Sequence, residues 1–384
     1  MTQLEQLIQD LCPNGVKMVK LGDVVDVLRG KRLTKSELSE DAQYNVYHGG
    51  LEPLGKYHLA NREADTVMVI NVGASAGTVG YSDMPFWSSD GCFCLSHSNE
   101  VNNKYLYYYL QTETNTLVSR VRRAGIPTLD SNSVLSLQIT LPPLAVQSEI
   151  VRLLDKFTLY KSELAAELAA RLQQYEYYRD QLLTFDDTVK RVKLGEVFDT
   201  RNGYTPSKNN SGYWENGTIP WFRMEDIRAN GRILYDSIQH VTPAAVKKIF
   251  PRNSIILATS ATIGEHALIK VDFLSNQRFT CCTLKEKYRD LLDIKFLFYY
   301  FFIIDEWCKS HIKLGNFSSV DMDALYSYPI PIPPLSEQER IVSILDRFDK
   351  LCHDIREGLP AEIDLRQKQY EHYRDKLLTF EAKG

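Results

Sequence analysis

The stretch QYEYYRDQLLTF at residues 174–185 returns as QYEHYRDKLLTF at residues 369–380, with ten of the twelve positions identical. Agreement at this level is far beyond chance, and an internal repeat sets the architecture before any local pattern is considered. Further upstream, LPPL at 141–144 returns as IPPL at 332–335. The offset is 191 at the proline pairs and 195 at the ends of the repeats, so the second copy holds four additional residues.

The segments that precede these repeats match more weakly. VKLG at 19–22 returns at 192–195, and GTVG at 77–80 resembles ATIG at 261–264. The chain is therefore two units, each a diverged globular body followed by a nearly unchanged tail. We interpret the two bodies as having different targets and the two tails as sharing one task. The predicted segments are a first body at 1–140, a first tail at 141–187, a second body at 188–331 and a second tail at 332–384.

Each tail is predicted to be a long helix that begins after the proline pair, because the residue before a proline is disfavoured in the α region. Apolar side chains recur at alternating spacings of three and four, which is typical of a coiled-coil seam. About 40 helical residues span roughly 60 Å. The obvious partner of each helix is the other helix, although two helices packed on their own bodies would be the plainer arrangement. The predicted seam consists of Ile150, Leu154, Phe157, Leu164, Leu168, Tyr175 and Leu182 in the first tail and Ile341, Leu345, Phe348, Ile355, Tyr370 and Leu377 in the second.

The second tail is interrupted by Gly358-Leu-Pro360, where we expect the helix to break or restart. The four additional residues act as a stutter in the heptad pattern. The bodies have mixed α and β character: residues 66–71 and 254–258 are predicted buried strands followed by Gly-rich turns. Residues 103–120 and 291–310 are predicted helices with aromatic faces.

Composition limits the class of protein. The 384 residues suggest two to three domains, and 44% hydrophobic with 24% charged residues is globular composition. The longest apolar run, residues 296–304, is too short for a membrane span, and residues 1–19 lack the apolar segment of a secretory signal. Seven cysteines without zinc or CxxC spacing are expected to be reduced thiols in a cytosolic protein.

Charge alone argues weakly against nucleic acid, because the formal net charge is −4. The charge is unevenly divided. Residues 1–140 hold 12 Lys and Arg against 15 Asp and Glu, whereas residues 186–331 hold 19 against 17. Any phosphate-binding surface must therefore be local.

The sequence contains segments that resemble catalytic motifs but lack essential residues of them. GLEPLGK at 50–56 has the spacing of a phosphate-binding loop, but Tyr57 replaces the hydroxyl that would hold Mg²⁺ and Pro53 removes a backbone donor. No histidine pair has metal-ligand spacing, and the Asn/Asp-Pro-Pro-aromatic loop of an amino-methyltransferase is absent from the sequence. We expect neither a catalytic residue, nor a bound metal, nor a cofactor in this chain. A recognition or scaffolding protein is therefore a better interpretation of the sequence than an enzyme.

Several loops carry side chains suited to nucleic acid. Arg and Lys contact phosphates or guanine, and Asn or Gln can pair with adenine. Any single cluster is equally compatible with a solvated loop, and only placement in corresponding loops of two related bodies favours DNA. The candidates are Arg29, Lys31, Arg32, Lys35, Arg120, Arg122 and Arg123 in the first body and Arg201, Asn202, Tyr204, Lys208, Gln277, Arg278, Lys313 and Asn316 in the second.

With these motifs in place, the whole chain resembles the specificity subunit of a type I DNA restriction–modification system. Each tail opens with the family's Pro-Pro-Leu-x-x-Gln-x-x-Ile pattern, at 142–150 and 333–341. The second body carries GYTPS at 203–207 and IPW at 219–221, with the family's Tyr-Trp between them. The first body departs from this pattern and has YNVYHGG at 44–50 and a later Phe-Trp, another style common in the family.

The resemblance implies an α+β fold, in which two pseudo-symmetric mixed α/β target-recognition domains are separated by two long helices that form an antiparallel coiled coil. Each domain would bind one half of a bipartite double-stranded DNA target, and the coil would set the gap between halves. Two adenine-N6 methyltransferase subunits would dock on the helices, and two restriction subunits would complete the complex. S-adenosylmethionine, ATP and Mg²⁺ would belong to those partners, and the chain itself would be non-catalytic.

Two other functions stay open from the residues. One is a coiled-coil interaction scaffold that binds protein or RNA; salt-insensitive nucleic-acid binding would favour it. The other is a self-sufficient methyltransferase or nuclease, which turnover by the purified chain alone would reveal.

Overall fold

The computed structural model describes residues 3–313, 318–353 and 357–380. The chain forms two compact units. Unit 1 consists of Met1–Glu163 with Ile363–Gly384, and unit 2 consists of Leu164–Glu362. Each unit therefore holds one of the two bodies together with a part of each tail. The predicted seam residue Ile355 and the predicted DNA-binding residue Asn316 lie outside the described residues.

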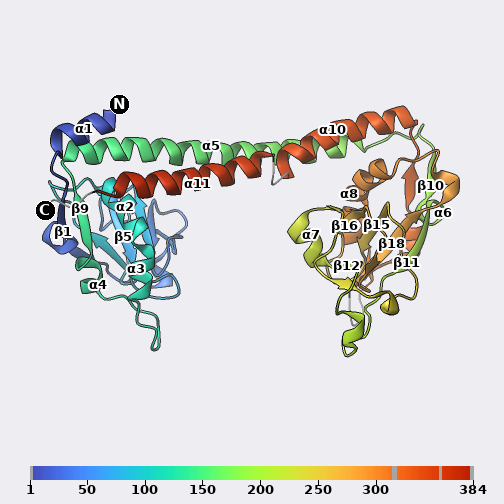
Figure 1. Cartoon of the computed structure of the whole chain (residues 1–384), viewed down its shortest axis with the longest axis horizontal. Helices are drawn as coiled ribbons and strands as arrows, with labels where there is room; N and C mark the ends of the chain where they lie inside the picture. The colour runs from blue at the N-terminus through green and yellow to red at the C-terminus, as the bar shows by residue number, and fades with distance from the viewer. Residues whose placement is uncertain (1–2, 314–317, 354–356, 381–384) are drawn as a thin grey trace. The chain divides into compact units, whose positions relative to one another are not determined.

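The body of unit 1 is built on a four-stranded sheet in the order β2-β8-β5-β6; Figure 1 labels its strand β5. Its strand β5 is buried along its whole length, as the apolar run at 66–71 predicts. A three-stranded sheet, β4-β3-β7, and a pair, β1-β9, complete the body. The elements are α1 (Gln3–Leu11), β1 (Lys17–Lys20), β2 (Val27–Arg29), β3 (Tyr44–Tyr47), β4 (Gly55–Tyr57), β5 (Thr66–Ile70), β6 (Val79–Ser82), β7 (Trp87–Ser88), β8 (Cys92–Leu95), α2 (Asn103–Thr112), α3 (Thr114–Ser119), α4 (Ser131–Leu135) and β9 (Gln138–Leu141).

The body of unit 2 repeats this plan around a five-stranded sheet, β11-β18-β15-β16-β13. Smaller sheets are β14-β12-β17, β10-β21 and β19-β20. The elements are β10 (Arg191–Lys193), α6 (Leu194–Val197), β11 (Phe198–Asn202), β12 (Ile219–Phe222), α7 (Met224–Asn230), β13 (Ile233–Leu234), β14 (His240–Val241), β15 (Ser254–Ala258), β16 (His266–Ile269), β17 (Leu274–Ser275), β18 (Phe279–Leu284), α8 (Ile294–Ser310), β19 (Ile312–Lys313), β20 (Ser319–Val320), α9 (Met322–Tyr326) and β21 (Pro329–Pro331).

Strand pairing confirms that the two bodies are copies. β5 pairs antiparallel with β6 and β8, just as β15 pairs antiparallel with β16 and β18. The short parallel pair β3–β7 matches the parallel pair β12–β17. Shared topology with little shared sequence fits bodies that keep a scaffold and vary what it presents.

The tails form helices that begin directly after the proline pairs. α5 (Leu144–Leu182) is continuous, whereas the second tail is divided into α10 (Leu335–His353) and α11 (Leu359–Leu378). Pro360 is the second residue of α11, a position where its missing N–H leaves no hydrogen bond unmade. The predicted restart at this proline is confirmed.

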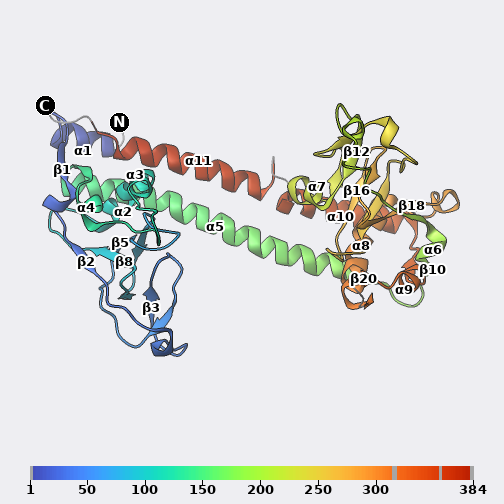
Figure 2. The same cartoon turned by 90° about the horizontal axis from the view of Figure 1, so that it is seen from below.

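Helix pairing within each unit follows the predicted seam. In unit 1, Phe157 of α5 stacks on Tyr373 of α11 with ring centroids 5.3 Å apart, and Lys161 donates to Gln367 over 2.6 Å. Since the partner number falls as the α5 number rises, α5 and α11 run antiparallel (Figure 2). In unit 2, Tyr178 of α5 stacks on Phe348 of α10 at 6.0 Å.

Many seam side chains also pack on a body. Ile150 and Leu154 are completely buried in the core of the first body, and Ile341 and Leu345 in that of the second. Each body also receives the end of the other tail. Unit 1 buries Tyr370 with Leu377 packed alongside, while unit 2 buries Tyr175 with Leu168 and Leu182 packed alongside; Leu164 is buried as well.

Candidate nucleic-acid interface

In both bodies two loops cross so closely that only glycine fits at the crossing. A Cβ on Gly30 would lie 1.9 Å from the carbonyl oxygen of Ser89, and one on Gly203 would lie 2.2 Å from that of Asn276. The next residue of each first loop fixes the crossing with a backbone hydrogen bond, from Lys31 N–H to the Ser88 carbonyl over 2.9 Å in the first body. Tyr204 N–H donates to the Ser275 carbonyl over 2.8 Å in the second.

From this crossing, a chain of backbone hydrogen bonds leads to a hairpin in the first body. Asn71, directly after β5, donates its N–H to the Gly91 carbonyl over 3.2 Å and accepts from Leu129 N–H over 2.8 Å. Arg122 and Thr128 exchange both of their backbone hydrogen bonds and so close the hairpin. Gly73 N–H donates to the Pro127 carbonyl over 2.9 Å. The backbone of all three segments is thereby fixed.

The second body repeats this arrangement. Thr259, directly after β15, donates to the Arg278 carbonyl over 3.0 Å and accepts from Val320 N–H over 2.9 Å. Ser260 bridges to Ser319, which pairs with Lys313 of β19. We call each set the ledge. The first ledge consists of residues 71–73, 89–91 and 122–128, and the second of residues 259–260, 276–278, 313 and 318–319.

Some of the predicted DNA-binding residues lie together on these ledges. Arg122 and Arg123 are exposed on the first ledge, and Gln277, Arg278 and Lys313 on the second. Lys313 contacts Asp321 at 2.8 Å, which raises the pKa of its ammonium and offsets part of its charge locally. Lys31, Arg32, Lys35 and Lys208 are exposed in the loops that leave the glycine crossings.

Other predicted residues make contacts inside their own bodies. Arg120 donates to the Ser133 carbonyl over 2.6 Å and thus holds α4. Arg201 lies 4.0 Å over the ring of Phe250 and donates to two backbone carbonyls. The Tyr204 hydroxyl bridges the backbone of Ala245 and Lys247, the Asn202 amide accepts from Thr280, and Arg29 lies over the ring of Phe93. These contacts give each of the five a partner within its own body, and their role in DNA binding stays a prediction.

Three features on or beside the ledges are absent from the residues predicted from the sequence. Asp90 is exposed, and its carboxylate contacts His48 Nδ1 at 3.2 Å. Thr205 donates to the Gln277 side-chain oxygen over 2.5 Å. Ile126, at the tip of the basic hairpin, is 72% exposed. The residue numbers of β7–β8 and β17–β18 differ by a constant 187, which aligns Asp90 with Gln277. Because Gln277 is a predicted DNA-binding residue, this alignment could have indicated Asp90 as well.

Each body is attached to its helix by the same side-chain contacts. Gln147, completely buried on α5, accepts from Asn102 N–H over 2.7 Å and donates to the carbonyls of Glu100 and Pro142. Gln338 on α10 makes the equivalent three bonds, accepting from Asp293 N–H and donating to the carbonyls of Leu291 and Pro333. Lys104 contacts Asp155 at 2.9 Å, and Lys295 contacts Asp346 at 2.6 Å. The same two contacts, a buried glutamine and a lysine–aspartate pair, therefore hold each body in its orientation on the helix.

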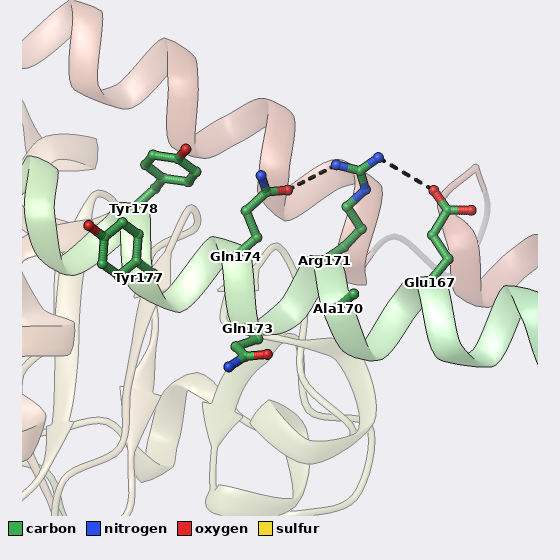
Figure 3. A pocket seen from close by; sticks show the side chains of 7 residues that line it. All are labelled: Glu167, Ala170, Arg171, Gln173, Gln174, Tyr177 and Tyr178. Atoms are coloured by element: carbon green, nitrogen blue, oxygen red, sulfur yellow. Dashed lines mark hydrogen bonds and ion pairs between the residues drawn. The ribbon is translucent and has the colours of Figure 1, made fainter.

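The helices also leave apolar side chains exposed at positions that the repeat equates. Leu144 and Leu335 are 46% and 42% exposed, and Tyr178 and Tyr373 are 43% and 42% exposed. Around Tyr178, α5 carries a shallow surface pocket of about 570 Å³, where Arg171 bonds to Gln174 at 2.9 Å and pairs with Glu167 at 3.6 Å (Figure 3). The two tails therefore expose similar apolar side chains at equivalent positions.

Unit 2 contains a buried charged network. His266 of β16 is completely buried, and its Nδ1 lies 2.6 Å from Asp305 of α8, which also pairs with Arg232 at 3.2 Å. Burial lowers the His266 pKa, and no hydrogen-bond partner reaches Nε2 in the described part of the chain. We infer a neutral imidazole that donates from Nδ1. The network borders a groove of about 1280 Å³ lined by α5, α7, α8 and α10.

The described residues hold no group of three or more His, Cys, Asp or Glu side chains arranged to bind a metal ion. All seven cysteines are buried, and each is a free thiol. Among the helices within residues 3–313, 318–353 and 357–380, none combines the length and apolarity of a membrane-crossing segment.

Comparison with known proteins is consistent with this architecture. Over residues 13–174 and 186–365, the chain matches the family described as type I restriction modification DNA specificity domain. It is 40% identical over 304 residues to the Escherichia coli type I restriction enzyme EcoR124I/EcoR124II specificity subunit, covering 73% of this chain and 72% of that protein. It is 53% identical over 201 residues to the E. coli EcoprrI specificity subunit, and this match spans only 50% of either chain.

The fold also matches a solved structure. The crystal structure of the type I restriction–modification system S subunit from M. genitalium superposes with a TM-score of 0.58 at 16% identity, covering 94% of this chain and 96% of the other. The same family matches both repeats of the chain over nearly their full length. The chain therefore belongs to the family of type I restriction–modification specificity subunits.

Proposed function

We propose that this chain is the non-catalytic sequence-specificity subunit of a type I restriction–modification complex, with each body binding one half of a bipartite DNA target. The observation that carries the proposal is the ledge, because the same hydrogen-bonded backbone occurs in both bodies while the exposed side chains on it differ. A conserved scaffold with variable side chains is what two half-sites of different sequence require. Membership of the family supports the same conclusion.

The basic hairpin suits the electrostatic part of DNA binding. Arg122 and Arg123 are exposed beside Gly125. Such cations fix the register of a protein on phosphates, whereas side chains at base edges supply specificity. The chain as a whole is acidic, so in the assembled complex the partner subunits would contribute further positive charge.

The helices would set the gap between half-sites and dock two adenine-N6 methyltransferase subunits. Support for docking comes from the exposed apolar side chains at equated positions of the two tails, such as Tyr178 and Tyr373. Two similar surfaces, one on each tail, favour the binding of two copies of the same partner. S-adenosylmethionine would be bound by those subunits, and ATP and Mg²⁺ by the restriction subunits that complete the complex.

The decisive experiment is modified-base mapping of DNA from cells that co-express this chain with the methyltransferase subunit encoded beside its gene. A split motif methylated on both strands, and lost on deletion of this gene, is the expected result. Replacing residues 1–140 by the first body of another family member should then change one half of the motif and preserve the other. A change in both halves would contradict independent bodies.

If a stable complex forms without methylation, salt-dependent DNA binding by the complex separates the remaining cases. Affinity that falls steeply with salt supports DNA recognition with an inactive partner. Affinity that is insensitive to salt would instead support a scaffold that binds protein or RNA.

A further inference from the structure

One segment of the ledge occurs in both bodies with different side chains. It is the turn between β7 and β8 in the first body and the turn between β17 and β18 in the second. The strands before and after them match at a constant offset of 187, so Ser89-Asp90-Gly91 corresponds to Asn276-Gln277-Arg278. Gly30 and Gly203 cross directly over these turns with no space for a side chain. The turns are therefore rigid platforms for the side chains that they expose.

In the second body, the platform presents an unengaged guanidinium. The backbone of Arg278 is fixed on both sides, since its N–H donates to the Asn276 side chain over 3.0 Å and its carbonyl accepts from Thr259. Its side chain is exposed and makes no hydrogen bond or ion pair with any described residue. A fixed backbone with a free guanidinium is suited to bidentate recognition of guanine O6 and N7.

In the first body, a carboxylate occupies the platform. Asp90 accepts from Ser89 Oγ at 3.1 Å and contacts His48 Nδ1 at 3.2 Å, both through Oδ1. An arginine cannot follow it, because a Cβ on Gly91 would lie 2.7 Å from Val72 and 2.9 Å from the backbone of Gly49. A carboxylate in this place is repelled by phosphates and accepts hydrogen bonds only, which matches the cytosine N4 amino group in the major groove.

Resting on the DNA-specificity function proposed above, we infer that the two platforms read a G·C pair from opposite sides: Arg278 contacts guanine in one half-site, and Asp90 accepts from cytosine in the other. Each half of the methylated motif then contains a fixed G·C pair that depends on one of these two side chains. The loss of either contact leaves the remaining positions of its half-site and the entire other half-site unchanged.

The test uses the full chain co-expressed with its methyltransferase subunit, with modified-base mapping as the readout. Arg278→Ala should make one G·C position of the half-site of the second body degenerate, and Asp90→Ala should do so in the other half-site. Discrimination at that position should fall roughly 5- to 150-fold, the range for one good base contact. Arg289→Ala is the matched control, because Arg289 is exposed beyond the opposite end of β18, paired with Glu286, and should leave the motif intact.

Competition binding with duplexes that each carry one substituted base pair completes the test for the purified complex. If Arg278→Ala lowers affinity equally for all duplexes, Arg278 contacts phosphate and the inference is overturned. It is also overturned if both variants keep every base of the wild-type motif. Absence of a split motif with the unaltered chain contradicts the proposed function itself, so the two failures are distinguishable.

Discussion

Tyr108 of α2 donates its hydroxyl hydrogen to Asp155 of α5 over 2.6 Å, and the repeat reproduces the contact, from Tyr299 of α8 to Asp346 of α10, at the same 2.6 Å. The same carboxylates also bind Lys104 and Lys295. Burial and the adjacent carboxylate raise the pKa of both phenols, so they remain donors at any physiological pH. Bodies that have diverged elsewhere retain this attachment because both must be held on the helix in one orientation.

Removing one such hydroxyl should weaken each unit equally. Tyr108→Phe and Tyr299→Phe each delete one hydrogen bond to a half-exposed carboxylate, and we expect each to lower the free energy of unfolding by about 1 kcal/mol. Chemical denaturation measures this. Tyr235→Phe, on an exposed tyrosine, is the control and should have no effect. Unequal losses for the two variants would argue against equivalent attachments.

The glycine crossings should not tolerate alanine. Gly30→Ala and Gly203→Ala place a Cβ against a backbone oxygen that cannot move alone, and we expect a loss of roughly 1–3 kcal/mol in unfolding free energy. Each variant should also reduce methylation through its own half-site. Gly50→Ala provides the comparison, since nothing lies within 4 Å of its Cβ position. Wild-type stability in both crossing variants would mean that the loops can separate.

The basic hairpin should contribute to the salt dependence of DNA binding. Each phosphate contact adds about 0.9 to the slope of log affinity against log salt for B-DNA. Arg122→Ala with Arg123→Ala should therefore reduce the slope by up to about 1.8 without changing the bases of the motif. Fluorescence anisotropy over a salt series measures the slope. Lys20→Ala, outside the ledge, should preserve it; an unaltered slope in the double variant would exclude phosphate contacts by this hairpin.

Stability of unit 2 should decrease in mild acid. Because burial lowers the His266 pKa, the folded chain binds fewer protons than the unfolded chain just below the unfolded value of about 6.5. Stability is therefore fully present above this value and is lost as pH falls toward the folded pKa. Denaturation at pH 7.5 and 5.5 should show a smaller difference for His266→Gln than for the wild type. His58→Gln, on an exposed histidine, should retain the wild-type difference.

The interruption of the second tail offers a test of the proposed gap-setting role. Insertion of one heptad near Gly358 lengthens one helix by roughly 10 Å. Modified-base mapping should then show a changed gap, or loss of methylation, with the bases of both halves unaltered. An unchanged gap with full methylation would contradict the idea that the helices act as a ruler.

Much of the scaffold is determined by the sequence alone. The repeat predicts two copies of one unit, and β15 occupies the predicted residues 254–258. The helix predicted at 291–310 forms as α8, while the one predicted at 103–120 is divided at Glu113 into α2 and α3. These features depend on periodicity and on proline and glycine placement, which act over a few neighbouring residues and can be read along the chain.

Only the tertiary structure shows which partner each of these side chains contacts. Periodicity places Ile150 and Leu154 on an apolar helix face, but whether that face meets a helix or a body depends on segments far away in sequence. Likewise, Arg120 and Arg122 are neighbours in a basic stretch, yet one holds α4 and the other lies on the ledge. Asp90 gains its position from Gly30 and Asn71, through contacts between residues about 20 to 60 positions apart. Such contacts form only when the chain closes on itself, and no local pattern encodes them.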